Sequence, residues 1–146
     1  MKRLLSLALA CLCITLLLAS CGGGARVEID DYEWYMRYAL IKSETSYAFV
    51  AMAEEMGGAY ENCAVVDVRL VAKNGELTLV DFTNDKTYTG TYRLSERLED
   101  GSIEYAITLG NSAGEAATAL TAADGNGNEP TLPILVGDYM LCFFAK

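Results

Sequence analysis

The dipeptide Asn74-Gly75 constrains the fold of this chain more than any other feature. It separates two runs of residues in which apolar and polar side chains alternate. Both central positions of a type I′ hairpin turn need positive φ angles, which Asn and Gly adopt most readily. A two-residue turn here places Ala72 opposite Leu77 and Leu70 opposite Leu79, so that the apolar side chains share one face. We therefore predict an antiparallel hairpin with Asn74-Gly75 as its turn.

Alternation with a period of two residues continues along most of the chain. Runs of this kind, bounded by turn-forming residues, cover 32–41, 66–73, 77–82, 87–94, 102–109, 115–122, 131–136 and 139–145. Strands of this length and spacing are typical of an antiparallel sandwich or barrel. The pattern predicts an all-β domain, an antiparallel up-and-down meander of about eight strands that closes on itself.

Segment 46–56 fits either of two structures. It contains Ala, Met and Glu, which favour a short helix, and it ends at Gly57-Gly58, which could cap one. Its residues Tyr47 and Phe49 alternate equally well as part of a strand. The last predicted hairpin, 131–145, has two apolar faces and needs cover on both sides. A helix at 46–56 would supply that cover.

The N-terminal segment has the pattern of a secretory signal. Lys2 and Arg3 precede an apolar run from Leu4 to Leu18, which is shorter than the roughly 20 residues that a membrane-spanning helix needs. The tetrapeptide Leu18-Ala19-Ser20-Cys21 resembles the bacterial lipobox. That resemblance implies that the Cys21 thiol carries diacylglycerol and that Cys21 becomes the first residue of the mature protein.

These signals divide the chain into three parts. We expect a lipoprotein signal peptide at 1–20, a lipidated cysteine with a flexible tether at 21–30, and one domain at 31–146. The domain is then held by its lipid on a bacterial cell membrane and faces outside the cytoplasm. In a cell with an outer membrane, we expect it on that membrane.

Charge and composition exclude several function classes. The chain has 20 acidic and 11 basic residues and a net charge of −9. This balance argues against nucleic acid as a partner, and the solubility of an extracytoplasmic domain explains it. The chain has no histidine, which excludes Ser-His-Asp and Cys-His catalysis and histidine zinc sites. Asp124–Glu129 begins like a calcium loop but lacks the glycine at its sixth position, so a turn explains it better. We expect no enzyme activity, no metal and no cofactor.

The five cysteines sort by position. Cys11 and Cys13 lie in the signal peptide, and Cys21 is the lipid site. Cys63 and Cys142 remain in the domain. A disulfide between them is one alternative, because a domain outside the cytoplasm meets oxidising conditions. Two buried free thiols that act as small apolar residues are the other.

Aromatic side chains gather on the strand face that we assign to the interior. They are Tyr32, Trp34, Tyr38, Tyr88, Tyr92, Tyr105 and Tyr139. An eight-stranded barrel is just wide enough to be filled by side chains or to hold one small ligand. We take Trp34, Tyr92 and Tyr105 as the candidate lining of such a cavity, and we favour a packed core over a cavity.

Several of these features together resemble a known family. They are Trp34 early in the first strand and the stretches 74–79, 86–92 and 130–139. The domain resembles the lipocalin-like (calycin) barrels and, more closely, small bacterial lipoproteins that carry such a domain and have no assigned function. The resemblance implies a small lipocalin-like barrel and favours a strand at 46–56. True lipocalins have Gly-x-Trp where this chain has Tyr32-Glu33-Trp34, so their ligand binding does not transfer.

Two classes of function remain. One is a binding module that holds a small apolar or aromatic ligand in the mouth of the barrel. The other is a structural or interaction protein whose outer apolar face, at Met140, Cys142 and Phe144, meets a partner. A void of a few hundred Å³ between the strand ends favours the first function. A filled core with an exposed apolar patch favours the second.

Overall fold

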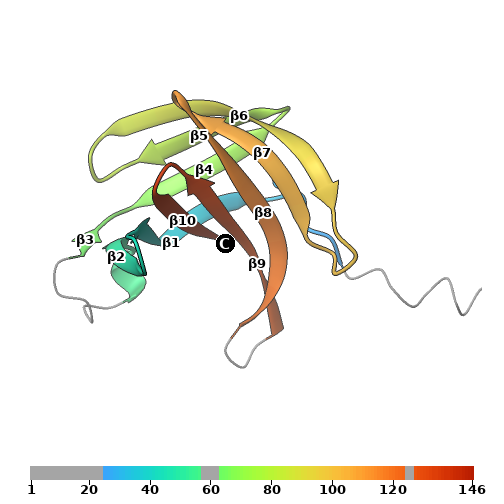
Figure 1. Ribbon diagram of the computed structural model, residues 1–146, viewed down its shortest axis with the longest axis horizontal. Coiled ribbons are helices and arrows are strands. Elements are labelled where there is room, and N and C mark those ends of the chain that lie inside the picture. Colours follow the sequence, from blue (N-terminus) through green and yellow to red (C-terminus); the bar gives the residue numbers. More distant parts are fainter. Residues whose placement is uncertain (1–24, 57–62, 124–126) are drawn as a thin grey trace, which may run out of the picture.

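The strands predicted from the alternation form one continuous sheet, antiparallel except between β2 and β3 (Figure 1). The computed structural model describes residues 25–56, 63–123 and 127–146. Its elements are β1 (Glu33–Lys42), β2 (Tyr47–Met52), the 3₁₀ turn η1 (Glu54–Met56), β3 (Ala64–Val65), β4 (Val68–Lys73), β5 (Glu76–Asp81), β6 (Lys86–Arg97), β7 (Ile103–Leu109), β8 (Ser112–Ala123), β9 (Gly127–Val136) and β10 (Tyr139–Ala145). Within the described residues, no helix is long and apolar enough to cross a membrane.

Eight of the strands close into an antiparallel barrel. From β4 to β10, each strand pairs with the next along the chain. The circle closes through β1, whose residues 33–35 pair with β4 while residues 34–41 pair with β10. The predicted all-β meander of about eight strands is confirmed, and the structure adds β2 and β3 outside the closed barrel.

The hairpin at Asn74-Gly75 forms with the predicted register. Asn74 and Gly75 have φ angles of 53° and 83°, as a type I′ turn requires. Ala72 lies opposite Leu77, and Leu70 lies opposite Leu79. All four of these apolar side chains are buried. Here the local turn chemistry and the burial pattern specify the same pairing.

A bulge in β1 changes which side chains face the interior. The pairing of β1 with β10 shifts between Met36 and Tyr38. Trp34 and Met36 face the core as predicted, but after the bulge Ala39 takes the buried position and Tyr38 points outward. The prediction that Tyr38 shares the interior face with Trp34 is therefore wrong. One extra residue on one strand reverses the alternation beyond it.

Three more tyrosines from the predicted interior set are largely exposed: Tyr32, Tyr88 and Tyr139. The fully buried large apolar side chains of the core are Trp34, Phe143, Ile29, Leu70, Leu77, Ile103, Leu132 and Ile134. The strands also approach closely inside this packing. A Cβ atom at Gly90 in β6 would lie 1.9 Å from the backbone oxygen of Thr108 in β7. Only glycine fits at that position without moving a strand.

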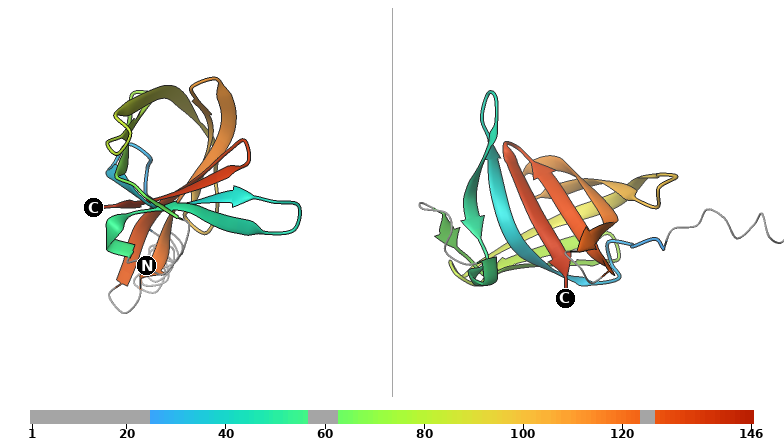
Figure 2. Two further views of the ribbon diagram at one scale, coloured as in Figure 1. Left: turned by 90° about the vertical axis from the view of Figure 1, so that its left-hand side faces the viewer. Right: turned by 90° about the horizontal axis from the view of Figure 1, so that it is seen from below.

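Segment 46–56 forms a strand, β2, followed by the single turn η1. The strand pairs with the second half of β1, and this hairpin projects from the barrel wall (Figure 2). Phe49 of β2 packs edge-on against Tyr38, with ring centroids 5.5 Å apart, and Tyr38 also meets Phe144 of β10 at 6.5 Å. The segment is thus a strand that extends the sheet beside β1, and the outer face of the last hairpin is not fully covered, because Leu135 remains 42% exposed.

Candidate functional site

The three residues predicted to line a cavity all belong to the main core or pack against it. Trp34 is fully buried, Tyr105 is 3% exposed, and Tyr92 is partly buried. The rings of Tyr92 and Tyr105 pack edge-to-face with centroids 5.9 Å apart. The structure therefore brings Tyr92 and Tyr105 into contact.

The chain just before β1 fills the space beside these rings. Val27 and Ile29 are 4% and 1% exposed and belong to the main core. The indole Nε1 of Trp34 donates to the Ile29 carbonyl oxygen at 2.7 Å, and the Ile29 amide donates to the Tyr105 hydroxyl at 3.1 Å. The Thr118 hydroxyl donates to the Val27 carbonyl. We call residues 27–29 the plug.

The flexible tether is shorter than the sequence predicted. Tether residues up to position 30 were expected to be free, but from Val27 onward the chain packs into the barrel. The sequence does carry a signal for this, because Val27 and Ile29 alternate with charged residues. That run is too short to stand out beside the glycines at 22–24.

Charged and polar groups hold the plug in place. The carboxylate of Glu28 forms an ion pair with Arg97 and accepts a hydrogen bond from the Tyr105 hydroxyl at 3.0 Å. The hydrogen bond from Arg97 is the main reason why the pKa of Glu28 is lowered. Burial is the main reason why the pKa of Tyr105 is raised to about 12. Among the described residues, every buried side-chain nitrogen and oxygen has a hydrogen-bond partner. The buried polar side chains around the plug are therefore all paired.

A groove of about 430 Å³ lies instead on the outer face of strands β7 to β10. Its apolar lining comes from Ala106, Ala117, Pro133, Leu135 and Met140. Leu135, within this lining, is 42% exposed. Glu104 and Glu115, both exposed, line the same space. We call this feature the outer groove.

The predicted outer patch is only partly exposed. Met140 lines the outer groove, but Cys142 is 6% exposed and its thiol interacts with the Tyr38 hydroxyl. The Arg37 guanidinium lies 4.0 Å from the centre of the Phe144 ring and pairs with Glu129 at 2.5 Å. The apolar surface is thus displaced toward Leu135, which sequence reasoning did not single out.

The considered disulfide is not formed. Cys63 and Cys142 are both free thiols, but only Cys142 is buried as the second alternative predicted, and Cys63 is partly exposed. Burial raises the pKa of the Cys142 thiol, which therefore stays protonated and behaves as a small apolar group.

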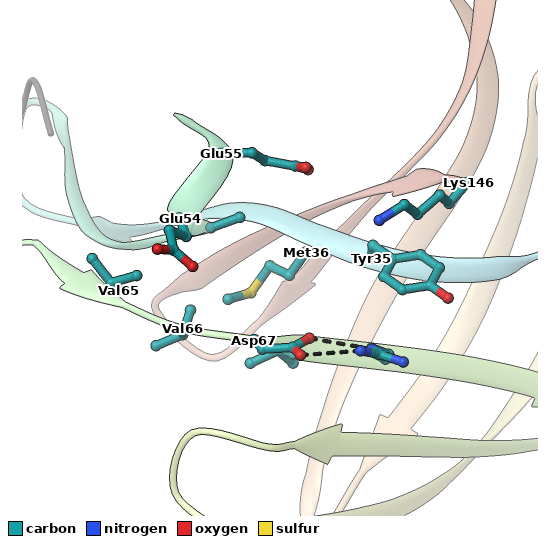
Figure 3. A pocket seen from close by; sticks show the side chains of 11 residues that line it. Tyr35, Met36, Glu54, Glu55, Val65, Val66, Asp67 and Lys146 are labelled. Atoms are coloured by element: carbon teal, nitrogen blue, oxygen red, sulfur yellow. Dashed lines mark hydrogen bonds and ion pairs between the residues drawn. The ribbon is translucent and has the colours of Figure 1, made fainter. Parts of the chain in front are cut away.

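A second pocket, of about 510 Å³, lies beside β1 where β4 diverges from it (Figure 3). Its lining combines an apolar floor, at Met36 and Val66, with charged side chains from β4, η1 and the chain end. Val65, also in the lining, is 58% exposed. We call this feature the wedge pocket.

Two predicted sites fall wholly or partly outside the described residues. Cys21 is one, and positions 124–126 of the calcium-like loop are the other. The described end of that loop, Glu129, pairs with Arg37. Within the described part of the chain, no three Asp, Glu or Cys side chains are placed to hold a metal ion.

No protein-family model, curated protein or solved structure matches the chain. Its function is therefore argued from its own geometry.

Proposed function

We propose that this protein is a lipid-anchored interaction module outside the cytoplasm, whose outer groove binds a partner protein. The observation that carries the proposal is the contrast between the two faces of the β7–β10 wall. Inside, the wall packs against the buried core, to which the plug residues Val27 and Ile29 belong. Outside, it leaves an apolar groove with Leu135 exposed. An apolar hollow with a charged rim on a protein surface is typical of an interaction site.

The groove favours one kind of partner. Small side chains at Ala106 and Ala117 leave room for a bulky apolar side chain beside Leu135. The two carboxylates at Glu104 and Glu115 would attract positive charge on either side of it. The partner is therefore a protein segment with an apolar anchor residue flanked by Lys or Arg.

The lipid anchor places the module. The lipobox-like tetrapeptide ends at Cys21, and the chain becomes part of the barrel core at Val27. Six residues span at most about 20 Å even when fully extended. The barrel then stays close to the membrane surface, within reach of membrane-bound partners. The resemblance to lipocalin-like bacterial lipoproteins supports the same placement.

Site-directed photo-crosslinking tests the groove. A benzoylphenylalanine at position 135 should cross-link a protein in cells, whereas the same group at Phe82 should not. Phe82 is also an exposed apolar residue, 54% exposed on the β5–β6 connection. The double substitution Glu104→Lys/Glu115→Lys should abolish the cross-link. Equal cross-linking at positions 135 and 82, or a cross-link that survives charge reversal, would contradict the proposal.

The anchor is tested separately with Cys21→Ser. The substituted protein should no longer incorporate a fatty-acid label and should leave the membrane fraction. Continued labelling would show that the lipid is not on this cysteine.

A further inference from the structure

The wedge pocket exists because β1 changes partners along its length. Residues 33–35 of β1 pair with β4, and residues 38–42 pair with β2. Two backbone hydrogen bonds hold the far wall: the Ala53 amide donates to the Arg37 carbonyl at 2.8 Å, and the Val66 amide donates to the Met52 carbonyl at 2.9 Å. This wall of the pocket is thus tied to the sheet by backbone hydrogen bonds.

Positive charge lines one side of the wedge pocket. The guanidinium of Arg69 is held by the carboxylate of Asp67, at 3.1 and 3.2 Å, and lies 5.1 Å from the centre of the Tyr35 ring. The Lys146 ammonium lies over the same ring at 5.2 Å. Lys146 belongs to none of the three ion pairs found among the described residues.

Negative charge lines the other side. Glu54 and Glu55 lie next to each other in η1, and their carboxylates point in different directions, with Met36 between the Glu54 carboxylate and the Lys146 ammonium (Figure 3). Neither glutamate pairs with a described cation. Unpaired charges of opposite sign therefore line one cavity, separated by an apolar floor.

We propose that the wedge pocket binds a short peptide with free termini. Its terminal ammonium would meet Glu54, with the charge of Glu55 nearby, its terminal carboxylate would meet Lys146, and an apolar side chain would lie on Met36. A volume of about 510 Å³ is within the range of small-ligand sites. A single amino acid carries its two charges on adjacent atoms, whereas a peptide of two or three residues separates them across an apolar body. This site is distinct from the outer groove and does not depend on it.

Isothermal titration of the full-length protein in detergent micelles tests the proposal. The ligand used is the tripeptide Leu-Ala-Leu with free termini, and binding is expected with a dissociation constant of about 1 mM or tighter. Acetylating its N-terminus or amidating its C-terminus should each weaken binding about tenfold, the effect of losing one hydrogen bond to a charged group.

Protein variants assign each terminus to its side. Glu54→Gln/Glu55→Gln should weaken binding of the free tripeptide about tenfold but should not weaken binding of the acetylated form further. Lys146→Met should likewise weaken binding of the free tripeptide about tenfold but should not weaken binding of the amidated form further. Exposed Glu44 and Lys73, which do not line the pocket, supply the matched controls Glu44→Gln and Lys73→Met. No binding at 10 mM tripeptide (about ten times that 1 mM limit), or binding that neither cap weakens, would overturn the proposal. Circular dichroism checks that each variant is folded.

Discussion

Trp34 and Tyr105 bind the two backbone polar groups of the same residue, Ile29. The Trp34 indole donates to the Ile29 carbonyl oxygen, and the Tyr105 hydroxyl accepts from the Ile29 amide, at 2.7 and 3.1 Å. Ile29 is 1% exposed, so both of its backbone groups would otherwise be buried without a partner. The two aromatic residues predicted as a cavity lining thus serve to fix the plug.

Removing either hydrogen bond should destabilise the domain. Trp34→Phe and Tyr105→Phe each leave one buried backbone group of Ile29 unpaired, at a cost of about 1–3 kcal/mol in the free energy of unfolding. Urea unfolding measures the change. Tyr88→Phe is the control, because Tyr88 is 42% exposed and the change should stay within about 0.5 kcal/mol. Equal effects of Tyr105→Phe and Tyr88→Phe would argue against the plug.

The Glu28–Arg97 pair should make stability depend on acid pH. The pKa of Glu28 is lowered in the folded protein from its usual 4.5, so the unfolded state takes up its proton first as the pH falls. Stability from this pair is present above pH 4.5 and is lost as the pH falls through the folded pKa. Glu28→Gln should flatten the curve of melting temperature against pH in that range. A parent-like slope in the variant would contradict this role.

Gly90→Ala should be far more damaging than an alanine at a more open glycine. The new Cβ would meet the Thr108 backbone oxygen at 1.9 Å, and a strand backbone cannot move aside as a flexible side chain can. We expect a loss of about 3 kcal/mol or more. In Gly110→Ala, the new Cβ has no atom within 4 Å. The substitution should lower the free energy of unfolding by only about 1 kcal/mol, because alanine disfavours the φ of +59°. A lower melting temperature for Gly110→Ala than for Gly90→Ala would contradict the close approach of the β6 and β7 backbones at Gly90.

The Asn74-Gly75 turn should tolerate one substitution and reject another. Gly75→Val places a β-branched residue at a φ of +83°, which should cost about 1–2 kcal/mol. Asn74→Gly keeps the positive φ accessible and should change stability by less than about 0.5 kcal/mol. Thermal unfolding of both variants checks the contrast, and an unchanged melting temperature in Gly75→Val would count against the turn type.

Features that depend on neighbouring residues could be predicted from the sequence. The hairpin register at Asn74-Gly75 follows from turn chemistry and alternation, and so do the strand β7 and the final hairpin around Gly137-Asp138. The eight strands of the barrel and the all-β class follow from the same signals, because each requires only residues that are close in the chain.

Tertiary structure alone decided the features that join distant parts of the chain. The bulge at Met36–Tyr38 arises where β1 must pair with three different strands, and it turns Tyr38 outward. The plug forms because Trp34 and Tyr105, 71 positions apart, meet around Ile29. The wedge pocket likewise follows from closure of the sheet, because β10 must return to β1 before Lys146 comes to lie beside Tyr35. Alternation shows that a residue faces one side of a strand, but only the closed barrel determines which side is the interior.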